Sequence, residues 1–226
     1  GRRTFFHCRG ANAYFDVKHC SFSKTNARIM HLGYLMLLDR LDSFEGGQTV
    51  AAKLLFNARS AGLETSVDMC SAMHPEFREI ALSALPMIDH LTINEIEAGL
   101  TVGEVIDPKN SGWLLRTAEQ LLSLGVKQTV TIHTEHGAVC ATADGLRLKQ
   151  PSLKLPVGYS KGATGAGDAF AAGMLYGLHE RFEIQERLRL AVCCAAACLQ
   201  DPTPSKGLRP VKDCLALADQ FGFGEF

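Results

Sequence analysis

Residues 161–170 read KGATGAGDAF, and the chain continues as AAGMLYGL over 171–178. The three glycines and their small neighbours let the backbone curl around one point, and the small and apolar residues that follow predict a helix. A loop of this kind presents several backbone N–H groups, and the helix adds the positive end of its dipole. The stretch therefore predicts an anion cradle, with Asp168 in the first turn of the helix.

Around this loop, apolar β-rich stretches alternate with stretches of helical period, which favours a layered α/β fold with a mainly parallel sheet. Right-handed crossovers would then place ligands at the carboxyl ends of the strands. Strands are expected at 27–37, 63–70, 89–95 and 127–134, and helices at 46–62, 75–88, 112–125, 169–180, 184–199 and 211–221. An antiparallel section is expected over 137–156, with a hairpin turn at Asp144-Gly145, and 201–210 is expected to be a loop.

The bulk composition favours one cytoplasmic domain, residues 1–226, that binds a small molecule. The net charge of -1, from 23 basic and 24 acidic residues, gives no reason to expect nucleic acid or an anionic membrane as a partner. The eight cysteines are scattered without a C-x-x-C pair, as expected of buried thiols in a reducing compartment. There is neither an apolar run of bilayer length nor a leader. Residues 2–15 (RRTFFHCRGANAYF) indicate the middle of a sheet, so an upstream segment is expected.

Asp168 has two interpretations from local physics alone. An aspartate near a helix N-terminus is a common cap. A carboxylate placed beside an anion cradle, with no cation to pair with, is also a candidate general base. The two interpretations are evenly balanced on the residues of the loop.

The wider stretch GATGAGDAFAAGMLYGL (162–178) resembles the signature of the ribokinase/PfkB family of carbohydrate kinases, in which G-A-G-D opens a helix of small residues. The resemblance implies a ribokinase-like layered α/β/α fold. It also implies that Asp168 is the general base, that Gly165, Ala166 and Gly167 form an anion hole, and that Thr164 lies at the nucleotide. The family often has Asp-Thr where this chain has Gly162-Ala163, which predicts a more flexible loop and a lost contact to the nucleotide phosphates.

Two further motifs carry the resemblance. TINEIEAG (92–99) contains Asn94 and Glu97 at the spacing of a capping box, and also matches the family's N-x-x-E motif, which is associated with magnesium and phosphates, partly through water. HTEHGA (133–138) is similar to the family's G-x-x-G stretch beside the nucleotide, with Gly137 in place and Thr134 where the first glycine is usual. Its two histidines need not share a strand face and have no third ligand nearby, which argues against zinc.

The resemblance implies an ATP-dependent kinase that uses Mg2+ to phosphorylate a hydroxyl of a sugar or sugar-like acceptor. A nucleoside acceptor is the alternative within the family, and a truncated relative that binds nucleotide without turnover is the alternative outside enzymes. The first strands of the sheet, the β lid and the Gly-Gly motif of family members are not found in the sequence. Relatives sometimes pair through the lid, so a homodimer is left open. A nicotinamide oxidoreductase is disfavoured, because no glycine fingerprint follows an early strand.

Overall fold

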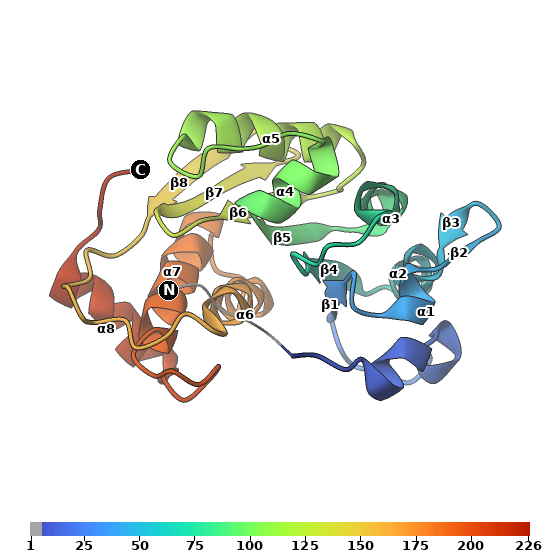
Figure 1. Cartoon of the computed structure of the whole chain (residues 1–226), viewed down its shortest axis with the longest axis horizontal. Helices are drawn as coiled ribbons and strands as arrows, with labels where there is room; N and C mark the ends of the chain where they lie inside the picture. Colours follow the sequence, from blue (N-terminus) through green and yellow to red (C-terminus); the bar gives the residue numbers. More distant parts are fainter. Residues whose placement is uncertain (1–5) are drawn as a thin grey trace.

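The computed structural model describes residues 6–226, which form a central sheet with helices on both faces (Figure 1). The strands are β1 (Ile29–Leu35), β2 (Phe44–Glu45), β3 (Gln48–Thr49), β4 (Glu64–Met69), β5 (His90–Asn94), β6 (Thr129–His133), β7 (Gly137–Thr142) and β8 (Arg147–Pro151). The α-helices are α1 (Asp39–Asp42), α2 (Val50–Ser60), α3 (Phe77–Ala84), α4 (Glu95–Val102), α5 (Ser111–Ser123), α6 (Ala166–His179), α7 (Ile184–Cys198) and α8 (Val211–Phe221).

The main sheet has the strand order β1-β4-β5-β6-β7-β8. The first four of these strands are parallel, and β7 and β8 are antiparallel to their neighbours. The predicted hairpin is confirmed, because Ala141 pairs with Arg147 across a turn in which Gly145 has φ 96°. The mainly parallel α/β sheet predicted from the alternation of strands and helices is therefore confirmed. The strands β2 and β3 form a separate small ribbon.

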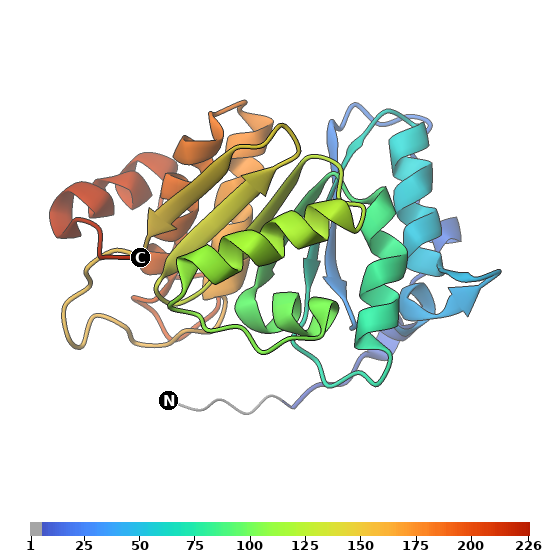
Figure 2. The ribbon, with the colours of Figure 1, turned by 90° about the horizontal axis from the view of Figure 1, so that it is seen from above.

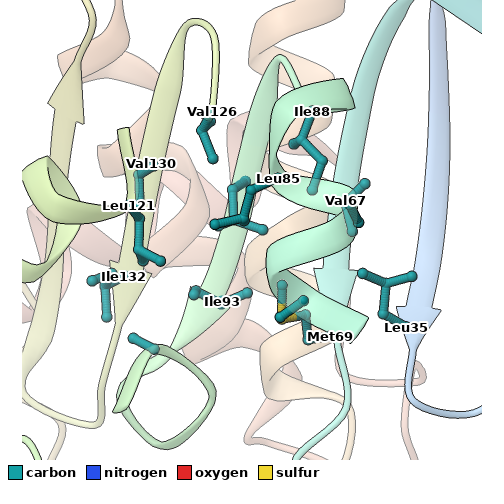
Figure 3. Packing of buried hydrophobic residues seen from close by; sticks show 14 of the residues in the cluster. Leu35, Val67, Met69, Leu85, Ile88, Ile93, Leu121, Val126, Val130 and Ile132 are labelled. Carbon is teal, nitrogen blue, oxygen red and sulfur yellow. The ribbon is translucent and has the colours of Figure 1, made fainter. Parts of the chain in front are cut away.

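The two faces of the sheet differ in chemistry. Helices α2 to α5 cover a face of large aliphatic side chains, and α6 to α8 lie on the other side (Figures 1 and 2). Figure 3 shows the aliphatic cluster, in which residues such as Val67, Ile93 and Ile132 point away from α6. The alternate positions of the same strands carry buried polar residues, including Ser66 and Thr92. This alternation of apolar and polar residues is unusual in a parallel sheet that is buried on both faces. Here it makes the sheet face that α6 covers polar.

Three sequence-based expectations differ from the structure. The helix expected at 46–62 begins at Val50, because residues 48–49 form β3 and Gly46-Gly47 are the turn of the β2-β3 ribbon. Residues 2–15 were expected in a sheet, but residues 10–14 form a 3-10 helix, Gly10–Tyr14, and residues 1–5 lie outside the described part. The GANAY segment has Tyr14 as its one large apolar side chain and buries no residue, so it offers no hydrophobic face to a sheet. The helix expected at 169–180 begins at Ala166, because Gly165 can take a left-handed N-cap conformation and the small residues after it continue the turn. None of the helices between residues 6 and 226 combines the length and the apolar character needed to cross a bilayer.

Candidate active site

The predicted site residues lie at the carboxyl ends of β5 and β6 and at the start of α6. Asn94 is the last residue of β5 and pairs with His133 of β6. The His133 ring packs against Phe170 of α6, with ring centroids 4.8 Å apart, and a Cβ at Gly167 would lie 3.6 Å from that ring. These contacts bring the N-x-x-E motif and the glycine loop to one edge of the sheet. This is the edge where parallel α/β sheets bind ligands.

The glycine loop is shaped by the loop between α7 and α8. Gly165 has φ 82°, and a Cβ there would overlap the carbonyl oxygen of Pro204. A Cβ at Gly162 would lie 2.9 Å from Cα of Pro202, so a larger residue at this position would have to displace the neighbouring backbone. The Sγ of Cys198 lies 3.2 Å from the same Pro204 oxygen and 3.7 Å from the carbonyl oxygen of Thr164. Gly162 is thus packed against a neighbour, which does not support the greater flexibility expected of the loop.

Asp168 is the third residue of α6, whose N-cap is Gly165. In the described residues its carboxylate makes no capping hydrogen bond to the helix N-terminus, and instead its Oδ1 accepts a hydrogen bond from the hydroxyl of Tyr34. The side chain is accessible to solvent, and partial burial of the carboxyl raises its pKa. The capping interpretation therefore loses its main support. An accessible carboxylate beside the first amides of α6 fits a proton acceptor.

Tyr34 was not identified from the sequence. It lies at the end of β1, 134 positions before its partner, and nothing in the local pattern HLGYL marks it as functional. Its phenol donates to the carboxylate, which favours the charged form of Asp168. A substrate hydroxyl that is to use this carboxylate oxygen has to replace the phenol or bind the other oxygen.

Asn94 and Glu97 form the capping box at the start of α4. Asn94 Oδ1 accepts from the N–H groups of Ile96 and Glu97, each at 2.9 Å. The Glu97 carboxylate accepts from the Asn94 N–H at 2.9 Å, from Asn94 Nδ2 at 2.8 Å and from Ser71 Oγ at 2.8 Å. Burial raises the pKa of Glu97 to about 7. The structural interpretation of this pair is confirmed, and its relation to magnesium stays a prediction.

Asp68, at the end of β4, is the second buried carboxyl at this edge and had no assigned role from the sequence. It is 6% exposed, and the N–H of Met69 donates to its Oδ1 at 2.7 Å. Burial, together with the charge of Glu97, raises the pKa of Asp68 to about 8. The two carboxyls come from segments 29 positions apart, so their mutual repulsion could not be seen in either motif.

These raised pKa values predict that stability falls as the pH rises. An unfolded aspartate loses its proton near pH 3.9, whereas Asp68 holds it in the folded state to about pH 8. Between these values the folded state binds more protons, so the free energy of unfolding decreases with pH. We expect Asp68→Asn to flatten this decline, measured by urea unfolding from pH 5 to pH 9. The exposed control Glu225→Gln is expected to leave the decline unchanged, and an equally steep decline in Asp68→Asn would contradict the assignment.

The segment after β6 forms a tight turn from Thr134 to Gly137, close to where the sequence predicted one. The Thr134 N–H donates to the Gly137 carbonyl oxygen at 2.8 Å, and Thr134 Oγ1 accepts from the N–H of His136 at 3.0 Å. A Cβ at Gly137 would lie 2.6 Å from the Gln150 carbonyl oxygen and 2.7 Å from the Phe226 ring, so only glycine fits. Threonine replaces the usual first glycine without strain, since its hydroxyl closes the turn. Contact of this turn with a nucleotide stays a prediction.

The pfkB family carbohydrate kinase model matches residues 1–209. A search of curated proteins found no match. Among solved structures, 2-dehydro-3-deoxygluconokinase from Thermotoga maritima superposes with a TM-score of 0.71 at 17% identity, covering 92% of this chain and 65% of that chain. Arabidopsis thaliana ribokinase, complexed with ribose and ATP, gives a TM-score of 0.61 at 23% identity, covering 74% of this chain and 51% of that chain.

A third similar structure is an Escherichia coli protein assigned as ribokinase II, in complex with ATP and Mg2+. It gives a TM-score of 0.69 at 20% identity, covering 91% of this chain and 63% of that chain. The chain thus spans between half and two thirds of the length of these relatives. The family match covers most of the chain, and the chain belongs to the pfkB family of carbohydrate kinases, whose members are phosphotransferases. The ribokinase-like fold inferred from the glycine loop is confirmed.

Proposed function

We propose that this chain transfers the γ-phosphoryl group of ATP to a hydroxyl of a sugar or sugar-like acceptor. The observation that carries the proposal is the accessible carboxylate of Asp168 next to the N–H groups of residues 165–167, at the N-terminus of α6. Family membership supports the reaction class, and the ribokinase solved with ribose and ATP supports the kind of substrates. The combination of base and amide cradle fits phosphoryl transfer, in which positioning and charge stabilisation do most of the work.

In the proposed mechanism, Asp168 accepts the proton of the acceptor hydroxyl while the hydroxyl oxygen bonds to the γ-phosphorus and ADP departs. The N–H groups of Gly165, Ala166 and Gly167 stabilise the charge on the transferred group, and the positive end of the α6 dipole adds to this. The close approach of Pro204 to Gly165 holds the amides in place before any substrate binds. Thr164, Thr134 and Gly137 are the proposed neighbours of the nucleotide.

The polar side chains of Asn94 and Glu97 already bond to protein donors, which limits how they could hold magnesium. Both oxygens of Glu97 accept hydrogen bonds from protein donors, and Asn94 Oδ1 accepts two. Among residues 6–226, no three His, Cys, Asp or Glu side chains gather closely enough to hold a metal ion by themselves. The fit is therefore to a hydrated ion, which Mg2+ prefers, with Asn94 and Glu97 reaching it through water. When bound, the ion would neutralise charge on the phosphates.

The test is magnesium-dependent ADP formation from ATP, measured across a panel of sugars and nucleosides. Turnover that needs a sugar supports the proposal, and turnover that needs a nucleoside supports the alternative acceptor. If neither acceptor class stimulates ADP formation, the non-catalytic relative is the better description. A homodimer and a cytoplasmic location stay predictions, which gel filtration with light scattering and cell fractionation would check.

A further inference from the structure

A sizeable cavity lies at the edge of the sheet opposite the glycine loop. It has a volume of about 660 Å3 and is lined by Glu64, His90 and Thr129, the first residues of β4, β5 and β6. Leu178 near the end of α6, the turn after it and the start of α7 form its other wall. Leu178 lies ten residues after Asp168 on α6, which is about 15 Å along a helix. This cavity is therefore separate from the candidate active site, and its volume is typical of small-molecule sites.

Four cationic side chains from separate segments line this cavity: Arg28, Lys127, Arg181 and Arg187. Among the ion pairs within 4 Å that the described residues form, none includes any of these four. Arg28 uses one nitrogen on the His179 carbonyl oxygen, at 2.8 Å, and Arg187 uses Nε on the Phe182 carbonyl oxygen, at 2.7 Å. Within residues 6–226, the remaining guanidinium nitrogens of these two arginines have no such partner.

Arg187 is half-buried, and burial lowers the pKa of its guanidinium, although the charges of Glu64 and Glu183 act in the opposite direction. A partly buried cation that forms no close ion pair is unfavourable, because the low local dielectric raises its self-energy and strengthens its repulsion from neighbouring cations. An anion placed in the cavity would relieve both costs.

Three carboxylates, those of Glu64, Asp144 and Glu183, also line the cavity and offset part of its positive charge. Glu64 accepts from His90 Nε2 at 2.9 Å, and Asp144 bonds the hydroxyl of Thr142. Glu183 is the N-cap of α7 but makes no capping hydrogen bond, so its side chain leaves the first N–H groups of that helix uncapped. Four cations thus face three carboxylates, which leaves one net positive charge, and the positive end of α7 adds to it. The balance of the cavity favours a compact anion, and the carboxylates suit hydroxyl donors on the same ligand.

We propose that this cavity is a second binding site, for the phosphate group of a small phosphorylated metabolite. Guanidinium groups bind phosphate oxygens through two parallel hydrogen bonds, and three of the four cations are arginines. A neutral sugar would leave the cations unneutralised, and a metal cation would be repelled by them. The site is independent of the proposed kinase reaction, because none of its residues belongs to the glycine loop or to the N-x-x-E motif.

The experiment is an NMR titration of 15N-labelled protein with inorganic phosphate and, separately, with ribose 5-phosphate. Shifts are expected at the amides of residues 127–129 and 181–184, and these are distinct from any shifts at 165–167. Tighter binding of ribose 5-phosphate would identify a phosphate ester as the occupant, and equal binding would identify the free ion. Neither arm depends on turnover, so failure of the kinase proposal would leave this result standing.

The variant Lys127→Ala with Arg181→Asn removes two charges that make no hydrogen bond or ion pair in the described residues. Asparagine suits the φ of 61° at Arg181. We expect at least about a tenfold loss of phosphate affinity at 127–129 and 181–184, since the variant removes two charged donors from the site. The control, Lys109→Ala with Arg116→Gln, removes the same net charge elsewhere. Shifts confined to 165–167, or equal affinities in the two double variants, would overturn the proposal.

Discussion

Asp168→Asn is expected to lower acceptor-dependent ADP formation by roughly a hundredfold to ten-thousandfold, the usual contribution of a well-placed general base. Asparagine keeps the size and the acceptor oxygen for Tyr34 but cannot take up the proton of the acceptor hydroxyl. Because the side chain is accessible, the free energy of unfolding is expected to change by no more than about 0.5 kcal/mol. The measurements are steady-state kinetics with the best acceptor and urea unfolding of both proteins.

Asp213→Asn is the matched control, because Asp213 is also the third residue of a helix, α8, and is exposed. Any general effect of losing a first-turn carboxylate next to a helix dipole appears in both variants. Only Asp168→Asn is expected to lose turnover. Undiminished turnover in Asp168→Asn would reject Asp168 as the base, and an equal loss in both variants would point to a non-local electrostatic effect.

Gly165→Ala is expected to be the most disruptive single substitution in the glycine loop. Alanine at φ 82° is strained by about 1 kcal/mol, and its Cβ would also overlap the Pro204 carbonyl oxygen. Forcing an extra carbon into a packed site costs a further 1–3 kcal/mol, about the usual range. We expect a total loss of about 2–4 kcal/mol in the free energy of unfolding, with weaker binding of a non-hydrolysable ATP analogue.

Gly158→Ala separates the two causes of this loss. Gly158 has φ 80°, almost the same as Gly165, but a Cβ there meets no atom within 4 Å. It carries the backbone strain without the overlap, and its stability loss is expected to stay near 1 kcal/mol. If the two variants lose the same stability, Pro204 does not constrain the glycine loop. Urea unfolding and calorimetric titration with the analogue give both readouts.

The sequence was informative where a structural feature depends on residues that are close together along the chain. The T-G-A-G-D run predicted a glycine turn that opens a helix, and the spacing of Asn94 and Glu97 predicted the capping box, because each rests on contacts within a few positions. The contact of Tyr34 with Asp168 could not be predicted, since it depends on where the end of β1 meets α6. The raised pKa of Asp68 likewise depends on its burial in the folded sheet and on the charge of Glu97 at the start of α4. The residues at 10–14 were misjudged because their aromatic and apolar neighbours suggested a strand.

The dependence of the glycine loop on its surroundings bears on protein engineering. Residues 161–168 are short and easily transplanted, yet they do not hold their shape alone. The Lys161 N–H donates to the Leu199 carbonyl oxygen at 2.7 Å, and Pro202, Pro204 and Cys198 contact the loop from the same side. The glycine loop grafted into another protein without the end of α7 and residues 201–205 would lose these contacts. Insertions after Leu199 would also disturb the glycine loop, although the residues that follow Leu199 contain none of the sequence motifs described above.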